Sequence, residues 1–177
     1  MFKITRDMIK AKGAFPAGYR EFCKTFPEED YPDGVEYQKI LDRCAENGRD
    51  SYASWLVYTF GKTTDVRKIE GDYISEKSIF VCGRLEVTGK ISCIGSIEAG
   101  DGIKASRGIE AGDGIEAGWG IKAGRGIKAG RGIEAGENFG IYAGLSVRLD
   151  SNDRQVKAKQ KPINLICGEF VVDDDKE

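Results

Sequence analysis

Apolar and charged positions alternate with a fixed six-residue period through the middle of the chain. Between residues 97 and 138 the unit Ile-Glu/Lys-Ala-Gly-x-Gly repeats almost without variation, and isoleucine stands at positions 97, 103, 109, 115, 121, 127 and 133. The first and third positions of each unit are apolar and the second is usually charged, which is typical of a very short strand with one face inward. A fixed short period predicts a solenoid, in which stacked units bury together what no single unit could bury alone.

The same period continues toward the N-terminus through Ile91, Leu85 and Ile79, which gives ten consecutive units. If three units form one turn, residues 18 apart stack at the strand spacing of about 4.8 Å, and ten units form a rod of about three turns. The glycines at positions four and six predict tight corners, including positive φ. The dipeptide Phe139-Gly140 interrupts the period, and such an insertion is expected at a corner.

Residues 1–61 show helical periodicity instead, and four helices are predicted there. Capping residues and glycines mark where these helices start and end. The marking residues are Thr5 and Gly13 for the first helix, Asp33 and Glu36 for the third, and Asp50 or Ser51 with Gly61 for the fourth. So small a bundle buries little surface, and we expect it to dock on the solenoid and cover its N-terminal end.

The predicted fold class is therefore α+β. A small N-terminal helical bundle precedes a hexapeptide-type triangular β-solenoid, a β-helix, with C-terminal capping strands in LSVRL, QVKAK and INLICGEFVV. The expected segments are a helical head at 1–61, a connector at 62–72, the β-solenoid at 73–144, capping strands at 145–172 and an acidic tail at 173–177.

A three-unit turn sorts the charged side chains onto three faces. The acidic face carries Glu98, Asp101, Glu116, Trp119, Glu134 and Glu137, and the basic face carries Lys104, Arg107, Lys122 and Arg125. On the third face Glu110 and Asp113 stack below Lys128 and Arg131, where opposite charges attract. Segregated faces are either fully solvated or kept for a partner. Trp119 fills an outward position otherwise held by Asp, Arg or Glu, so it is a candidate contact residue unless the head covers it.

The remaining composition excludes several classes of protein. The net charge of -2 predicts no bulk attraction to nucleic acid or membranes, and no apolar run reaches the roughly 18 residues of a membrane span. The start of the chain has no apolar signal core, so we expect a cytoplasmic protein. Five cysteines form no CxxC pair and histidine is absent, so no metal site and no cofactor are predicted, and the thiols are expected to be reduced.

No catalytic residue is predicted either. Hexapeptide acyltransferases need a histidine base, which this chain lacks, and no GxxxxGK[ST] phosphate loop occurs. The rhythm of GRLEVTGKISCIGSIEAGDGIKAS resembles the bactofilin-type polymer-forming β-helix. The whole layout, with KGAFPAGYREF and SYASWLVYTFG before GIEAG and GIKAG units, resembles small proteins of phages and prophages.

The phage resemblance implies a stoichiometric inhibitor of host defence machinery, such as an anti-CRISPR protein, acting in the cytoplasm of a bacterial host. The first hypothesis is thus a non-enzymatic protein-interaction module whose acidic face binds a host protein or ribonucleoprotein complex, with nucleic-acid mimicry as one mode and no membrane partner. The alternative is a bactofilin-like self-assembling scaffold, because solenoid edges pair readily. Homodimerisation is a further option for the same edges.

Overall fold

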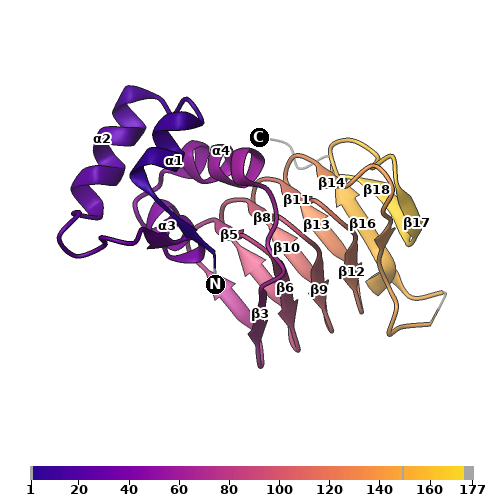
Figure 1. The fold of residues 1–177 in the computed structure, drawn as a ribbon. Coiled ribbons are helices and arrows are strands. Elements are labelled where there is room, and N and C mark those ends of the chain that lie inside the picture. Colours follow the sequence, from indigo (N-terminus) through magenta and orange to yellow (C-terminus); the bar gives the residue numbers. More distant parts are fainter. Residues whose placement is uncertain (1, 149, 174–177) are drawn as a thin grey trace.

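The computed structural model describes residues 2–148 and 150–173. Four N-terminal helices precede a parallel β-solenoid (Figure 1), which confirms the α+β class and the order of the two parts. The helices are α1 (Arg6–Ala11), α2 (Pro16–Thr25), α3 (Tyr37–Glu46) and α4 (Asp50–Phe60). Among the described helices, none is both long and apolar enough to cross a membrane.

The sequence signals at the helix ends are confirmed only in part. The Thr5 hydroxyl accepts a hydrogen bond from the Met8 amide and caps α1, and Gly61 ends α4 with a φ of 70°. The predicted caps of α3 and α4 are wrong. The capping positions are Glu36 and Arg49, and neither side chain bonds to the helix. Directly before α3, Val35–Glu36 forms a short strand that pairs with Lys3–Ile4, a pairing that local spacing did not reveal.

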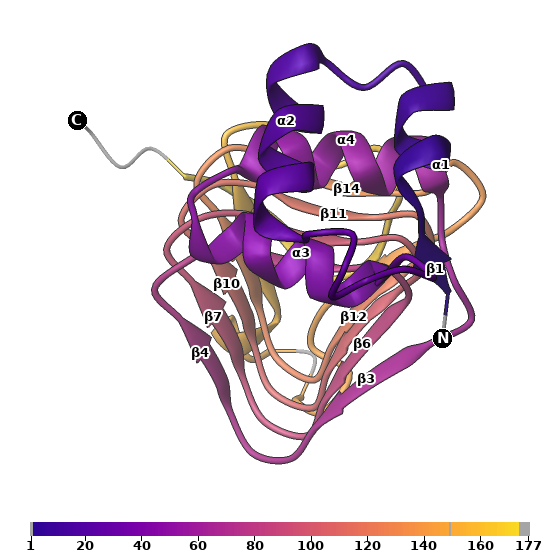
Figure 2. The same ribbon diagram turned by 60° about the vertical axis from the view of Figure 1, so that its left-hand side comes forward.

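Three parallel sheets form the sides of the rod, and Figure 2 shows them around a triangular section. Sheet I comprises β5 (Ile79–Val81), β8 (Ile97–Ala99), β11 (Ile115–Ala117) and β14 (Ile133–Ala135). Sheet II comprises β3 (Val66–Ile69), β6 (Arg84–Val87), β9 (Ile103–Ala105), β12 (Ile121–Ala123), β15 (Ile141–Tyr142) and β17 (Leu165–Cys167). Sheet III comprises β4 (Tyr73–Ser75), β7 (Ile91–Cys93), β10 (Ile109–Ala111), β13 (Ile127–Ala129), β16 (Gln155–Ala158) and β18 (Glu169–Val172).

The register confirms that residues 18 apart are neighbours. Ile115 lies between Ile97 and Ile133 in adjacent strands of sheet I. The expected length of about three turns is wrong, because sheets II and III each have six strands and the rod has about six turns. Its outer turns lack the GI(E/K)AG motif, so the repeat alone gives too short a length for the solenoid.

The C-terminal strands also differ in detail from the expectation. Residues 145–148 form a turn rather than a strand, and residue 149 lies outside the described part. The segment INLICGEFVV divides at Gly168, whose φ is 124°, into β17 and β18 on different sheets. Both strands extend the parallel stacking and are the last strands of sheets II and III. Residues 174–177 of the expected acidic tail are outside the described residues.

The inward isoleucines form one continuous core along the rod. Their exposed fraction is at most 5%, and Ile121 in the middle is completely buried. Burying each such side chain contributes about 1.5–3 kcal/mol. Because each turn contacts only its neighbours, the stability of the rod is nearly a sum over turns.

The glycines of the repeat have a different role from the one expected. No glycine between residues 97 and 138 has a positive φ, so the expectation of left-handed corners is wrong there. A Cβ on Gly130, at position four of its unit, would overlap the carbonyl oxygen of Gly112 in the turn below. A Cβ on Gly132, at position six, would meet nothing within 4 Å. Gly112, Gly118, Gly124 and Gly136 approach a carbonyl oxygen of the turn below just as closely, whereas Ser106 stands at position four of its own unit. At these glycines the missing Cβ lets successive turns stack closely.

The head docks on the N-terminal end of the rod, as expected. Phe80 of β5 is 2% exposed and belongs to the core of the head. The side chain of Gln38 on α3 bonds to the open edge of β5: its Nε2 donates to the Phe80 carbonyl at 2.7 Å, and its Oε1 accepts from the Cys82 amide at 3.1 Å. One amide side chain thus takes the place of a neighbouring strand.

Candidate functional site: an acidic groove on sheet I

A groove of about 680 Å³ runs over sheet I beside β11 and β14, and residues 160–164 form its C-terminal rim. Most of the charged side chains that line it are acidic. The acidic ones are Glu98, Asp113, Glu116, Glu134 and Glu137, and the basic ones are Arg131 and Lys161. Arg131 is itself paired with Asp113 at 2.6 Å, so the groove has an acidic character overall.

Three glutamates of the groove form a column across neighbouring strands. Glu116 pairs in register with Glu98 on one side and with Glu134 on the other. Carboxylates one strand apart, at about 4.8 Å, repel one another. Glu116 is exposed at its outer side but desolvated in part by the groove walls, which raises its pKa, and the negative charge of Glu134 raises it further. A cation placed over this column would relieve the repulsion.

The first member of the column is covered by the head. The Ser54 hydroxyl of α4 donates a hydrogen bond to Glu98 Oε1 at 2.7 Å, and α4 lies over this side of the rod in Figure 2. The pKa of Glu98 is raised to about 7, mainly by burial and in part by the charges of Glu116 and Asp50, while the hydrogen bond from Ser54 lowers it. Glu98 therefore joins the head to the rod, and Glu116, Glu134 and Glu137 remain exposed.

The raised pKa of Glu98 makes the stability of the protein depend on pH. The folded state keeps this proton to about pH 7, whereas an ordinary glutamate releases it near 4.5, so unfolding releases a proton in between. Stability is expected to fall as pH rises from about 4.5 to 7. In Glu98→Gln the drop in the free energy of unfolding between about pH 4.5 and 7 should be smaller by about 1 kcal/mol than in the wild type. Thermal unfolding followed by circular dichroism should show this as a difference of about 2–4 °C in the midpoint.

Glu137→Gln is the control, because it removes the same charge from a side chain that is exposed and lies after β14, away from α4. It should keep the wild-type pH dependence. An unchanged pH dependence in Glu98→Gln would show that the carboxyl is not held protonated under α4.

The two other residues predicted on the acidic face lie at a corner of the rod and are already engaged. Asp101 forms an ion pair with Arg84 at 3.2 Å, and its side chain is only 13% exposed. Trp119 stacks on Phe139 with ring centroids 4.8 Å apart and an interplanar angle of 13°. The Lys62 ammonium lies 4.0 Å from the centroid of the same indole ring.

Trp119 therefore forms contacts within the molecule that connect the head to the rod. The Phe139-Gly140 insertion lies at a corner, as expected, and it places the phenyl ring against the indole. Lys62 comes from the chain that leaves α4, so the indole connects the head to a later turn of the rod. This arrangement leaves Trp119 about one-third exposed.

The basic residues lie on sheet II and the corner that follows it. Lys104 and Lys122 are register neighbours on adjacent strands, and both are exposed. Arg107 lies 3.6 Å from Asp72, and Arg125 lies 3.9 Å from Asp153, with both guanidinium side chains about half exposed. Acidic residues thus partly neutralise this corner, and no groove of comparable size adjoins these four residues among the main hollows of the described structure.

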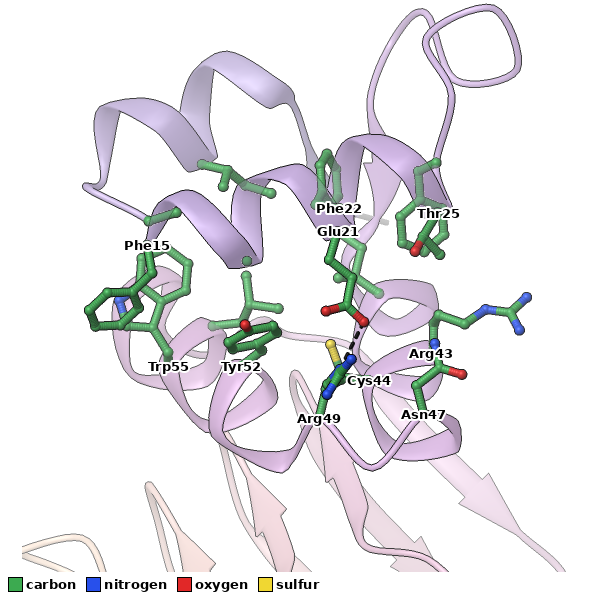
Figure 3. A pocket seen from close by; sticks show the side chains of 16 residues that line it. Phe15, Glu21, Phe22, Thr25, Arg43, Cys44, Asn47, Arg49, Tyr52 and Trp55 are labelled. Atoms are coloured by element: carbon green, nitrogen blue, oxygen red, sulfur yellow. Dashed lines mark hydrogen bonds and ion pairs between the residues drawn. The ribbon is translucent and has the colours of Figure 1, made fainter.

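A second hollow lies inside the head, between α2 and the pair α3 and α4 (Figure 3). Its volume is about 60 Å³ and its lining is mostly apolar. Glu21 and Arg49 form an ion pair at 2.8 Å that spans the two helical layers. Burial raises the pKa of Cys44 in this hollow to about 11, so the thiol stays protonated at neutral pH. The hollow is therefore a small gap in the packing of the head and not a reactive site.

The sequence prediction of the binding residues did not include four parts of this site. Ser54 and Lys62 come from the head, and their positions depend on how it docks. Residues 160–164 become a groove wall only because the chain crosses this side without forming a strand. Phe139 could have been found, because an aromatic residue inserted into a regular repeat has no place in the core.

Within the described residues, no group of three or more Cys, Asp or Glu side chains is placed to hold a metal ion. Comparison with protein-family models, with curated proteins and with solved structures finds no match to this chain. The shape and charge of the sheet I groove are therefore the basis for a functional proposal.

Proposed function

We propose that the chain is a non-enzymatic protein-interaction module that binds a basic partner surface in the groove of sheet I. The observation that carries the proposal is the column of Glu116 and Glu134 beside an open groove. The carboxylates are held on rigid strands and repel one another, so a cationic partner gains attraction without ordering the site. Electrostatic complementarity of this kind favours specificity and fast association.

The finer proposal concerns the partner. A basic surface that accepts closely spaced carboxylates resembles one that binds nucleic acid, whose phosphates are also closely spaced along each strand. On this ground we propose a host nucleic-acid or defence complex as the target. The role as a phage-encoded stoichiometric inhibitor, such as an anti-CRISPR protein, is proposed from the resemblance of the sequence layout alone. The occupied corner residues restrict the binding surface to Glu116, Glu134 and Glu137.

The test is a charge reversal with a matched control. Glu116→Lys with Glu134→Lys should weaken retention of a bacterial partner from lysate by about tenfold or more. Glu86→Lys with Glu110→Lys changes the net charge equally but lies on sheets II and III, away from the groove. Equal retention by both double variants would contradict the proposed acidic surface.

A self-assembling scaffold is the second candidate, and the strands at the ends of the sheets favour it. β3 and β4 are terminal strands of sheets II and III, and each pairs with one described strand only. Light scattering at rising protein concentration separates the two functions. The interaction module should keep a constant mass, whereas a scaffold should grow.

A further inference from the structure

We infer that the groove binds its partner by strand addition, in which an extended basic segment pairs with β14 and becomes the next strand of sheet I. This inference rests on the proposed function, since it says how the groove engages a partner. Strand addition obtains affinity from backbone hydrogen bonds and specificity from alternate side chains.

The edge of β14 has no strand partner on the groove side. Among the described strands, β14 pairs only with β11. In the turn before, the Ile115 amide donates to the Gly132 carbonyl and the Ala99 carbonyl accepts from the Gly118 amide. By the same register, the amide of Ile133 and the carbonyl of Ala135 face away from β11, toward the groove.

The chain's own next pass across this side packs against the end of the rod, where Pro162 is buried, but in the described structure residues 160–163 form no backbone hydrogen bond with β14. At one corner the Lys159 amide bonds to the Arg131 carbonyl, and at the other the Ile141 amide bonds to the Asn164 carbonyl. Between these corners, residues 159–164 are two fewer than residues 113–120 of an ordinary turn. The shorter segment has no strand structure, and Pro162 has no amide hydrogen to donate.

The floor and rim of the groove suit an alternating segment. Ile133 and Ala135 are 5% and 7% exposed, slightly more than Ile115 and Ala117 at 1% and 2%. Ile163 on the rim is fully exposed and offers an apolar contact. An aliphatic or small side chain of the added strand would therefore point inward at this end.

The outward position of an added strand would lie over Glu134. The molecule already contains this arrangement on sheet III, where Lys128 lies next to Glu110 in register. An aliphatic-basic-small pattern in parallel orientation therefore fits the edge. The chain's own unit at β12, Ile-Lys-Ala, has that pattern and supplies a defined probe.

Two peptides of equal length from the repeat form the experiment. The basic probe is Gly-Ile-Lys-Ala-Gly-Arg-Gly-Ile-Lys-Ala-Gly, from residues 120–130, and the acidic control is Gly-Ile-Glu-Ala-Gly-Asp-Gly-Ile-Glu-Ala-Gly, from residues 108–118. Fluorescence anisotropy with the full chain should show saturable binding of the basic peptide, about tenfold tighter than the acidic one. The same measurement with Glu116→Lys and Glu134→Lys should abolish that preference.

Hydrogen exchange decides the mode of binding. The Ile133 and Ala135 amides should exchange faster than those of Ile115 and Ala117 in the free protein, and about tenfold more slowly once the basic peptide is bound. Charge-dependent peptide binding without that protection would overturn strand addition and leave the acidic-surface function standing. Equal binding of both peptides would overturn the match to an aliphatic-basic-small strand.

Discussion

Replacing Gly130 by alanine is expected to lower the free energy of unfolding by about 3 kcal/mol, whereas the same change at Gly132 should alter it by less than about 1 kcal/mol. The added Cβ at position 130 would overlap the Gly112 carbonyl oxygen, and at position 132 it would enter open space. A clash with backbone cannot be relieved by choosing another rotamer, so two turns of the rod would have to move apart.

Urea unfolding followed by circular dichroism measures the difference between these two variants. The two carry the same chemical change two residues apart, so helix or strand propensity cannot account for a difference in their midpoints. If Gly130→Ala and Gly132→Ala unfolded at the same urea concentration, close stacking would not be the reason for glycine at position four.

Gln38→Leu is expected to lower stability by about 2–4 kcal/mol, because leucine leaves the Phe80 carbonyl and the Cys82 amide without their partner. The effect should be local to the junction of head and rod. Hydrogen exchange at the Cys82 amide is the most direct measurement, and it should become faster in this variant.

Lys39→Leu is the matched control on the same helix. Lys39 is exposed and its ammonium lies 4.8 Å from the centroid of the Tyr31 ring, so its loss should cost less than about 1 kcal/mol. Slow Cys82 exchange in Gln38→Leu would mean that the edge of β5 is protected by other contacts.

The regular part of this fold could be predicted because one physical rule repeats. An isoleucine every six residues defines the inner face, and with three units per turn the 18-residue register follows, including the column from Glu98 to Glu134. The strands in QVKAK and INLICGEFVV were predicted as caps rather than as further turns, because they lack the repeat's glycines and bury other residues, Val156 fully and Leu165 in part. Period alone thus identifies the architecture but not its extent.

The candidate site was predicted less completely, because its shape depends on contacts between distant segments. Spacing placed Glu116 and Glu134 on one face, and the register confirms that they are neighbours. It could not show that Ser54 covers Glu98 or that Lys62 packs on Trp119, since both depend on how the head docks. The role of the glycines was also wrong, because a single turn considered alone contains no neighbour to clash with.

The side chain of Gln38 makes the two ends of sheet I different. One end of this sheet is closed by α3, and the other presents the edge of β14, so a segment can be added at one end only. A second molecule that offered its β14 to the β5 end of the first would meet α3 in the way. Association through sheet I therefore ends after a single step, and the expected stoichiometry at this site is one bound segment per chain.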